Sequence, residues 1–197
     1  MFERLKNIHG IKDEEIVGIF LTGSSLFLQN YKDIDYIVVY RKSERQQREF
    51  INTYGFDAEK NKNVDIFAFS EELFLDIINF NQNNFFTSAI YSVFFNTHKP
   101  IKNELNIKVD IFSNKEKYLN ILRYACDVYF LLPEVYWIGH ENYCKKTFWS
   151  VILGLMFLEN NSYEVTPEMI DIVQKCHDGC LSKSWEDWVR DRLYTDK

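Results

Sequence analysis

The sequence has few residues that interrupt regular structure: 7 glycines and 3 prolines among 197 residues. Disordered and linker-rich chains are rich in these residues and poor in aromatic ones, whereas this chain contains 17 Phe, 12 Tyr and 4 Trp. The composition therefore excludes a disordered protein. It predicts one large or two small globular domains with a sizeable core.

Long apolar runs and a signal-peptide pattern are also missing. A membrane-spanning helix needs about 20 consecutive apolar residues, and a secretion signal places an apolar run after a basic N-terminus. We therefore expect a cytoplasmic protein. Its 4 cysteines, all in the C-terminal half, are then expected to be free thiols.

Basic residues are fewer than acidic ones: the sequence contains 23 Lys and Arg and 29 Asp and Glu, which gives a net charge of −6. Binding along a nucleic-acid backbone depends on clustered Lys and Arg, so the composition argues against long nucleic acid as a partner. Residues 99–123 carry a local excess of basic side chains. These basic side chains could bind a triphosphate or a tRNA end. The favoured interpretation is an ordinary solvated surface.

Two apolar runs, 16–21 and 36–40, flank a Gly-Ser turn at Gly23 and an Asp-Ile-Asp segment. The pattern predicts a strand, a turn and a second strand that begins with acids. Side chains alternate along a strand, so Asp33 and Asp35 share a face and lie about 7 Å apart. Two such carboxylates need a cation between them, and Mg²⁺ prefers carboxylate and phosphate oxygens.

The Gly-Ser turn offers backbone N–H groups and hydroxyls that can hold a phosphate. Ser24 is the better candidate for that contact and Ser25 a second, with a helix N-cap as the alternative role of Ser24. Gly23 is expected where a side chain would block the phosphates or require an unfavourable backbone angle. Turn and acids together indicate phosphoryl-type chemistry on a nucleotide.

Gly23-Ser24 followed by Asp33-Ile34-Asp35-Tyr36 resembles the signature of the DNA polymerase β-like nucleotidyltransferase superfamily, including its small bacterial and phage-type members. The resemblance covers residues 14–69. It implies an α/β (α+β) fold, in which a mixed sheet flanked by helices is followed by a C-terminal helical domain.

The same resemblance implies a transferase that depends on Mg²⁺ in a two-metal site, with Mn²⁺ as the alternative ion. Such an enzyme moves a nucleoside monophosphate from a nucleoside triphosphate to a hydroxyl or similar acceptor and releases pyrophosphate. ATP is the expected donor. The acceptor would be a small molecule, a protein or a tRNA end.

Residue roles also follow from the resemblance. Asp33 and Asp35 would hold both metal ions, and Asp65 would ligate the ion that activates the acceptor hydroxyl. A repeated Val-Asp-Ile-Phe offers Asp110 as the alternative third carboxylate, but the segment between Asp35 and Asp65 is long enough for a crossover that lays their strands side by side. A lysine of the helical part, Lys145, would reach the triphosphate, with plain surface exposure as its alternative role.

A second function stays open. Leu26-Phe27-Leu28-Gln29 stands where many superfamily members carry an arginine and a second glycine. This difference favours a degenerate member that binds a nucleotide or a partner protein without turnover, such as one half of a toxin–antitoxin or phage-defence pair.

The chain is expected to contain a catalytic domain over 1–80, a connecting segment over 81–112 that completes the core, and a helical substrate-side domain over 113–197. Within these, capping and breaking signals predict helices and apolar runs predict strands. The predicted helices span 45–54 (between Ser43 and Gly55), 70–79, 85–95, 113–132, 141–159 and 166–178, with a last one from 184, and the further strands span 63–69 and 109–112.

The C-terminal half also contains two pairs of possible zinc ligands. His140 and Cys144, like Cys176 and Cys180, are four residues apart, so each pair would share one face of a helix. Because these helices are rich in apolar residues, cysteine acting as a small hydrophobic side chain is the favoured interpretation.

Overall fold

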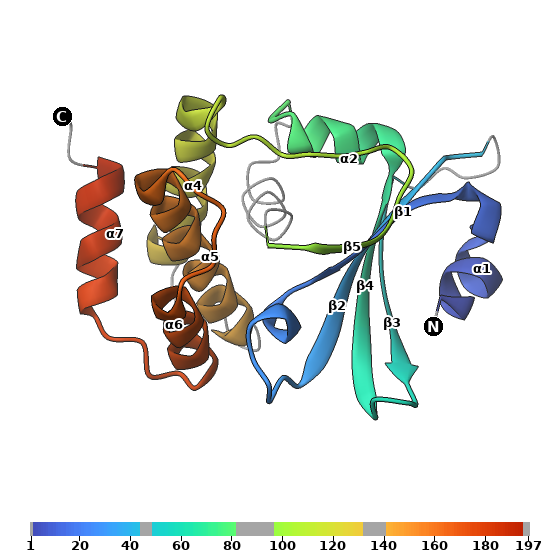
Figure 1. Cartoon of the computed structure of the whole chain (residues 1–197), viewed down its shortest axis with the longest axis horizontal. Helices are drawn as coiled ribbons and strands as arrows, with labels where there is room; N and C mark the ends of the chain where they lie inside the picture. The colour runs from blue at the N-terminus through green and yellow to red at the C-terminus, as the bar shows by residue number, and fades with distance from the viewer. Residues whose placement is uncertain (1, 44–48, 82–96, 132–140, 195–197) are drawn as a thin grey trace. The chain divides into compact units, whose positions relative to one another are not determined.

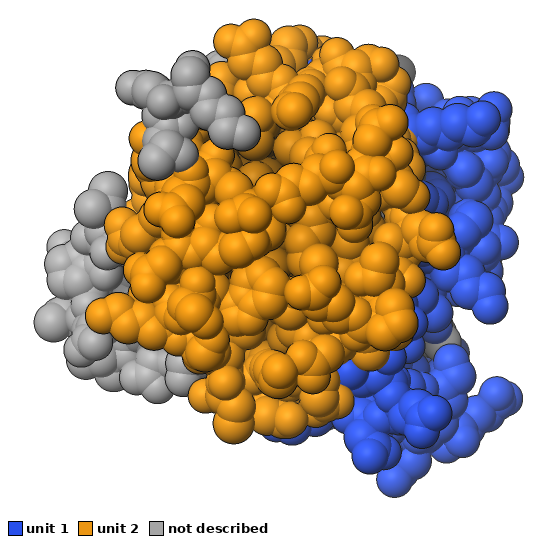
Figure 2. All heavy atoms as spheres, turned by 60° about the vertical axis from the view of Figure 1, so that its left-hand side comes forward, with its two compact units in different colours: residues 1–79, 97–108 blue, residues 80–96, 109–197 orange. Residues whose placement is uncertain are grey.

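The computed structural model describes residues 2–43, 49–81, 97–131 and 141–194, and only the backbone of 128–131 and 141–147. The chain divides into two compact units, which Figure 2 shows in separate colours. Unit 1 comprises residues 1–79 and 97–108, and unit 2 comprises residues 80–96 and 109–197. The fold is α/β, with a mixed sheet and flanking helices followed by C-terminal helices, as the sequence predicts (Figure 1).

Unit 1 contains a five-stranded sheet of order β3-β4-β2-β1-β5, in which only β2 and β4 run parallel. Its strands are β1 (Ile16–Thr22), β2 (Asp33–Tyr40), β3 (Phe50–Asp57), β4 (Lys62–Ser70) and β5 (Lys99–Asn103). Its helices are α1 (Glu3–His9) and α2 (Glu71–Ile78), with the short 3₁₀ turns η1 (Asp13–Glu15) and η2 (Ser24–Leu26). The predicted strands over 16–21, 36–40 and 63–69 are thereby confirmed.

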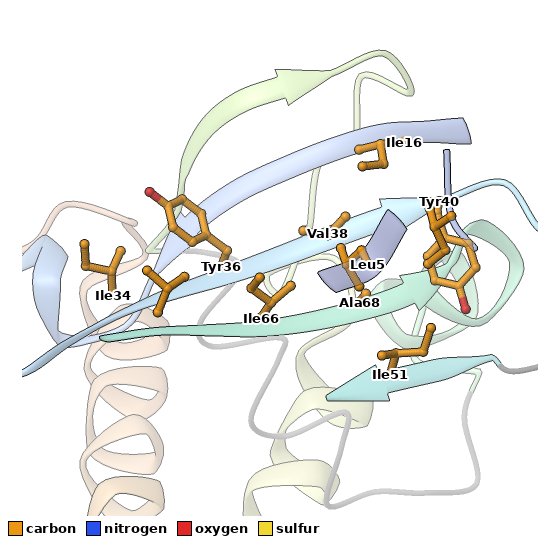
Figure 3. Close-up of a cluster of buried hydrophobic side chains, with 11 residues drawn as sticks. Leu5, Ile16, Ile34, Tyr36, Val38, Tyr40, Ile51, Ile66 and Ala68 are labelled. Carbon is orange, nitrogen blue, oxygen red and sulfur yellow. The ribbon is translucent and has the colours of Figure 1, made fainter. Parts of the chain in front are cut away.

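One face of this sheet forms the core that α1 covers (Figure 3). Alternate residues of β2 and β4 are fully or nearly fully buried there and pack with Leu5 of α1. Burying such side chains is the dominant favourable term in folding. The strand residues in this layer are Ile34, Tyr36, Val38, Tyr40, Val64, Ile66 and Ala68.

The opposite face packs against α2 near the ends of β2 and β4. Phe74 of α2 lies with its ring centroid 6.1 Å from that of Phe20 and 5.8 Å from that of Phe69. Ser70 begins this helix as predicted, because its hydroxyl accepts the Leu73 N–H at 3.2 Å. The helix therefore covers the end of this face that lies away from the first residues of β2 and β4.

Residues 50–57 form β3, so the helix predicted over 45–54 is wrong from residue 50 onward, while 44–48 lie outside the described residues. Gly55 lies inside the strand and does not end a helix. Buried and exposed side chains alternate along β3, which is the period of a strand. Aromatic and β-branched residues fit this position at the sheet edge, where pairing with β4 decides the conformation.

Unit 2 is helical, with α4 (Lys115–Leu131), α5 (Glu141–Asn160), α6 (Pro167–His177) and α7 (Ser184–Tyr194), close to the predicted bounds. Described residues of α5 are buried on all its sides from Phe148 to Phe157, as in a helix at the centre of a bundle. None of the helices in the described ranges is long and apolar enough to cross a membrane. The helix predicted over 85–95 lies outside those ranges.

Candidate functional site

Asp35 lies at the centre of a row of residues that crosses four strands of the sheet. Its register partners are Thr22 on β1 and Asp65 on β4, and Asp65 in turn is opposite Tyr54 on β3. Residues directly opposite in neighbouring strands project on the same face. Asp33 stands two residues before Asp35 and so shares this face as well.

The sheet therefore gathers the three acids expected from the sequence on one face, at the start of its two central parallel strands. Asp33, Asp35 and Asp65 are each half-buried. The side-by-side strand pairing expected of Asp35 and Asp65 is present. The crossover between them contains strand β3, where the sequence predicts a helix. Carboxylates held this close repel one another unless a cation or donor group compensates them.

Asp110 belongs to unit 2, where residues 109 and 110 have no regular structure and residues 111–114 form a turn, so the strand predicted over 109–112 is wrong. Its carboxylate accepts the backbone N–H groups of Phe112 and Ser113, each at 3.0 Å. Hydrogen bonds from the Ser113 hydroxyl and these N–H groups hold the pKa of Asp110 below its usual value. Asp110 thus has a local structural role in shaping the turn.

Gly23 closes the turn against Asp35. Its backbone has φ +78° and ψ −166°, a region that essentially only glycine adopts. A Cβ atom at this position would lie 2.0 Å from Oδ2 of Asp35. The carboxylate of Asp35 therefore occupies the space that any other residue at position 23 would need.

Ser24 and Ser25 begin the short turn η2 behind this glycine. Ser24 is 6% exposed, and Gly23, not Ser24, is the N-cap, so the alternative role of Ser24 as N-cap is wrong. The Ser25 hydroxyl donates to the Thr22 carbonyl at 3.2 Å. The first N–H groups of a helical turn have no acceptor within that turn, so the backbone of these two serines presents donors at its start.

The remaining candidates are in unit 2. Lys145 belongs to α5, but its side chain lies outside the described residues, as do the Cys144 side chain and all of His140. Cys176 is buried, which raises the pKa of its thiol to about 12, and Cys180 is exposed.

Two residues of the row, Thr22 and Tyr54, are not among the site residues that the sequence predicts. Thr22 directly precedes the Gly-Ser turn and is 2% exposed, so its adjacency to the motif could have identified it. Tyr54 falls within the helix predicted over 45–54, so the sequence does not predict it on a strand beside the acids. The Arg4 guanidinium carbon lies 4.2 Å from its ring centroid, and a hydrogen bond from Arg4 lowers the pKa of Tyr54.

The donor set fits a hard divalent ion only in part. No group of three or more His, Cys, Asp or Glu side chains in the described parts of the chain could hold a metal ion. Mg²⁺, however, usually takes one or two carboxylates and completes its shell with water and substrate phosphates. The adjacent Asp35 and Asp65, with Asp33 beside them, suit an ion that arrives together with a nucleotide.

Gly23→Ala should destabilise the protein and weaken nucleotide binding. The substitution requires a backbone region that costs about 1–3 kcal/mol for a residue other than glycine, and it must displace Asp35. For a chain of this size we expect the melting temperature to fall by about 2–4 °C for each kcal/mol lost. Thermal unfolding and nucleotide titration calorimetry measure the two effects.

Gly10→Ala is the matched control for that variant. Gly10 also has a positive φ of +69°, but nothing lies within 4 Å of the Cβ it would gain. Its substitution should lower stability and leave nucleotide affinity unchanged. Equal nucleotide affinity in the Gly23 and Gly10 variants would contradict the role assigned to the turn.

No protein-family model matches the chain, and no curated protein matches it. Among solved structures, the crystal structure of a nucleotidyltransferase-like protein from Exiguobacterium sibiricum 255-15 is similar to this chain, with 13% sequence identity and a TM-score of 0.32. The match covers 96% of this chain and 69% of that one. A likeness of this degree assigns no function to this chain.

Proposed function

We propose that this protein is a Mg²⁺-dependent nucleotidyltransferase. It transfers a nucleoside monophosphate from a nucleoside triphosphate, with ATP as the expected donor, to a hydroxyl or similar acceptor. The observation that carries the proposal is the row in which Asp35 stands between Thr22 and Asp65, with Gly23 against its carboxylate. This row joins the acids to the Gly-Ser turn of the motif.

In the proposed reaction an acceptor oxygen attacks the α-phosphorus, and the bond from that phosphorus to the bridging oxygen of pyrophosphate breaks. The chain contributes position and charge more than covalent chemistry. The N–H groups of Ser24 and Ser25 would donate to phosphate oxygens, which suits the start of a helical turn. Asp65 would take the proton of the acceptor hydroxyl as a general base.

The metal would be held by Asp33, Asp35 and Asp65. When bound, Mg²⁺ neutralises charge on the triphosphate and makes the acceptor hydroxyl easier to deprotonate. Asp35 and Asp65 are supported as the inner pair by their register across β2 and β4. Asp33 faces Asn63 across the same pair of strands, one step further toward the strand start.

The test is incubation of the purified protein with Mg²⁺ and each of the four α-labelled triphosphates, with pyrophosphate release and transfer of label as readouts. Release of pyrophosphate with transfer of label to an added acceptor or to the protein supports the proposal. Nucleotide binding without release supports the second candidate, a degenerate binding module. That candidate is favoured by the apolar side chains that follow Ser25, among which Leu28 is buried.

Mg²⁺ should stabilise the protein mainly in the presence of nucleotide, because the acids offer an incomplete set of metal ligands. A ligand at 100 times its dissociation constant adds about 2.7 kcal/mol of stability, which corresponds to about 5–10 °C in a protein of this size. We therefore expect that shift with Mg²⁺ and ATP together, and little change with either alone. A full shift with Mg²⁺ alone would show a site complete without nucleotide.

A further inference from the structure

Unit 2 contains a cavity of about 390 Å³ where the end of α5 meets the starts of α6 and α7. Its lining combines two indole rings, two carboxylates and two neutral polar side chains. These aromatic and polar residues, which Met156 and Pro167 accompany in the lining, are Glu159, Asn160, Thr166, Glu168, Trp185 and Trp188. The volume falls within the range of small-molecule sites, which are concave and partly aromatic with a few placed polar groups.

The two tryptophans form an aromatic corner. The ring centroids of Trp185 and Trp188 lie 5.2 Å apart with 67° between the ring planes, and both side chains are half-buried. Tryptophan has the strongest attraction for cations among aromatic residues, because its ring faces carry negative potential. Two indoles at this angle offer such faces in two directions.

One of these two rings already binds a cation of the chain itself. The guanidinium carbon of Arg192 lies 3.8 Å from the Trp188 ring centroid, and its Nε lies 2.5 Å from Oε1 of Glu159. Arg192 thereby orients Trp188 and balances the charge of Glu159. The chemistry of the corner thus suits a flat or weakly hydrated cation beside a carboxylate.

Glu168 leaves one negative charge of the lining unbalanced. It lies exposed in the first turn of α6 and makes no hydrogen bond or ion pair with another described residue. Trp185 and Glu168 thus add a second ring and a second carboxylate to the lining, beside the Trp188 ring and the Glu159 carboxylate that Arg192 contacts. Thr166 accepts the Met169 N–H at 3.3 Å and keeps its own hydroxyl proton to donate.

We propose that this cavity binds a small organic ammonium ion, with the cation against Trp185, its charge balanced by Glu168, and a polar tail toward Asn160 and Thr166. The two carboxylates of the lining would repel an anion. A divalent metal ion is not expected either, because the described residues contain no group of three His, Cys, Asp or Glu side chains that could hold one. The proposal does not rest on the proposed nucleotidyl transfer, because none of the residues that line the cavity is assigned to that reaction.

The test is calorimetric titration of the full chain with choline, at constant ionic strength, beside its uncharged carbon isostere 3,3-dimethyl-1-butanol. We expect saturable binding of choline at one site and much weaker binding of the isostere. Glu168→Gln should weaken choline binding about fivefold, and Trp185→Leu should weaken it by a similar factor.

Glu164→Gln is the matched control, because Glu164 is an exposed acid near α6 that does not line the cavity. Its choline affinity should equal that of the unmodified protein. Absence of choline binding, equal binding of the isostere, or unchanged affinity in Glu168→Gln would each overturn the proposal. Glu168→Gln keeps the test decisive if Trp185→Leu disturbs the packing of α7.

Discussion

Asp35→Asn should abolish nucleotidyl transfer while the protein stays folded. Asp35 is the acid at the centre of the site, because it is opposite both Thr22 and Asp65 and its carboxylate fills the space beside Gly23. Losing about 4 kcal/mol of charge stabilisation in the transition state would lower the rate about a thousandfold. Asparagine has the same shape, so the packing against Gly23 is retained.

The same variant should hold or slightly raise the melting temperature of the nucleotide-free protein. Removing one charge from a crowded group of carboxylates relieves repulsion, and active-site residues are often exchanged with a gain in stability. Asp33→Asn should behave likewise. Pyrophosphate release and thermal unfolding, measured on the same preparations, separate the loss of chemistry from a loss of fold.

Asp13→Asn is the comparison for these variants, because it makes the same chemical change on η1. It removes only an exposed ion pair with Lys6, which contributes little stability. Transfer at the unmodified rate is expected for it. If Asp35→Asn and Asp33→Asn also kept that rate, the reaction would have to take place elsewhere in the molecule.

Asp65→Ala is expected to lower turnover about a hundredfold, with nucleotide affinity within a few-fold of the unmodified protein. Interactions made only in the transition state reduce the rate with little effect on ground-state binding. Asp33 and Asp35 would still hold the nucleotide side of the site. Single-turnover rates and calorimetric nucleotide affinities measure the two quantities separately.

Asp110→Ala serves as the control for Asp65→Ala. Asp110 accepts hydrogen bonds from the backbone of its own turn, so its loss should lower stability slightly and leave both kinetic measurements unchanged. An inactive Asp110 variant beside an active Asp65 variant would move the third carboxylate into unit 2 and contradict the arrangement described.

Local sequence signals predicted the secondary structure correctly where interactions between residues close in the sequence determine it. The run over 16–21, the acids that begin β2 and the capping residues Ser70 and Thr166 all act within a few residues, and the structure confirms the elements they predict. The shared face of Asp33 and Asp35 is of the same kind, since it follows from strand alternation alone.

Local sequence signals gave a wrong secondary structure where pairing with a distant strand decides the conformation. Ser43 followed by an acid, with Gly55 twelve residues after that serine, predicts a helix over 45–54, yet residues 50–57 pair with β4. Strand preference depends on what lies on the neighbouring strand and on the two faces of the sheet. The repeated Val-Asp-Ile-Phe shows the same limit, because one copy lies in strand β4 and the other lies outside any strand.

The sequence by itself determined the strand–turn–strand unit, the common face of Asp33 and Asp35, and the helical character of the C-terminal part, because these depend on short-range periodicity and capping. Only the tertiary structure decided the register that sets Asp65 directly opposite Asp35, that Tyr54 extends the row, and that the Asp35 carboxylate occupies the space next to Gly23. These contacts join residues far apart in the chain, and they follow from the register of long-range strand pairing, which no local pattern encodes.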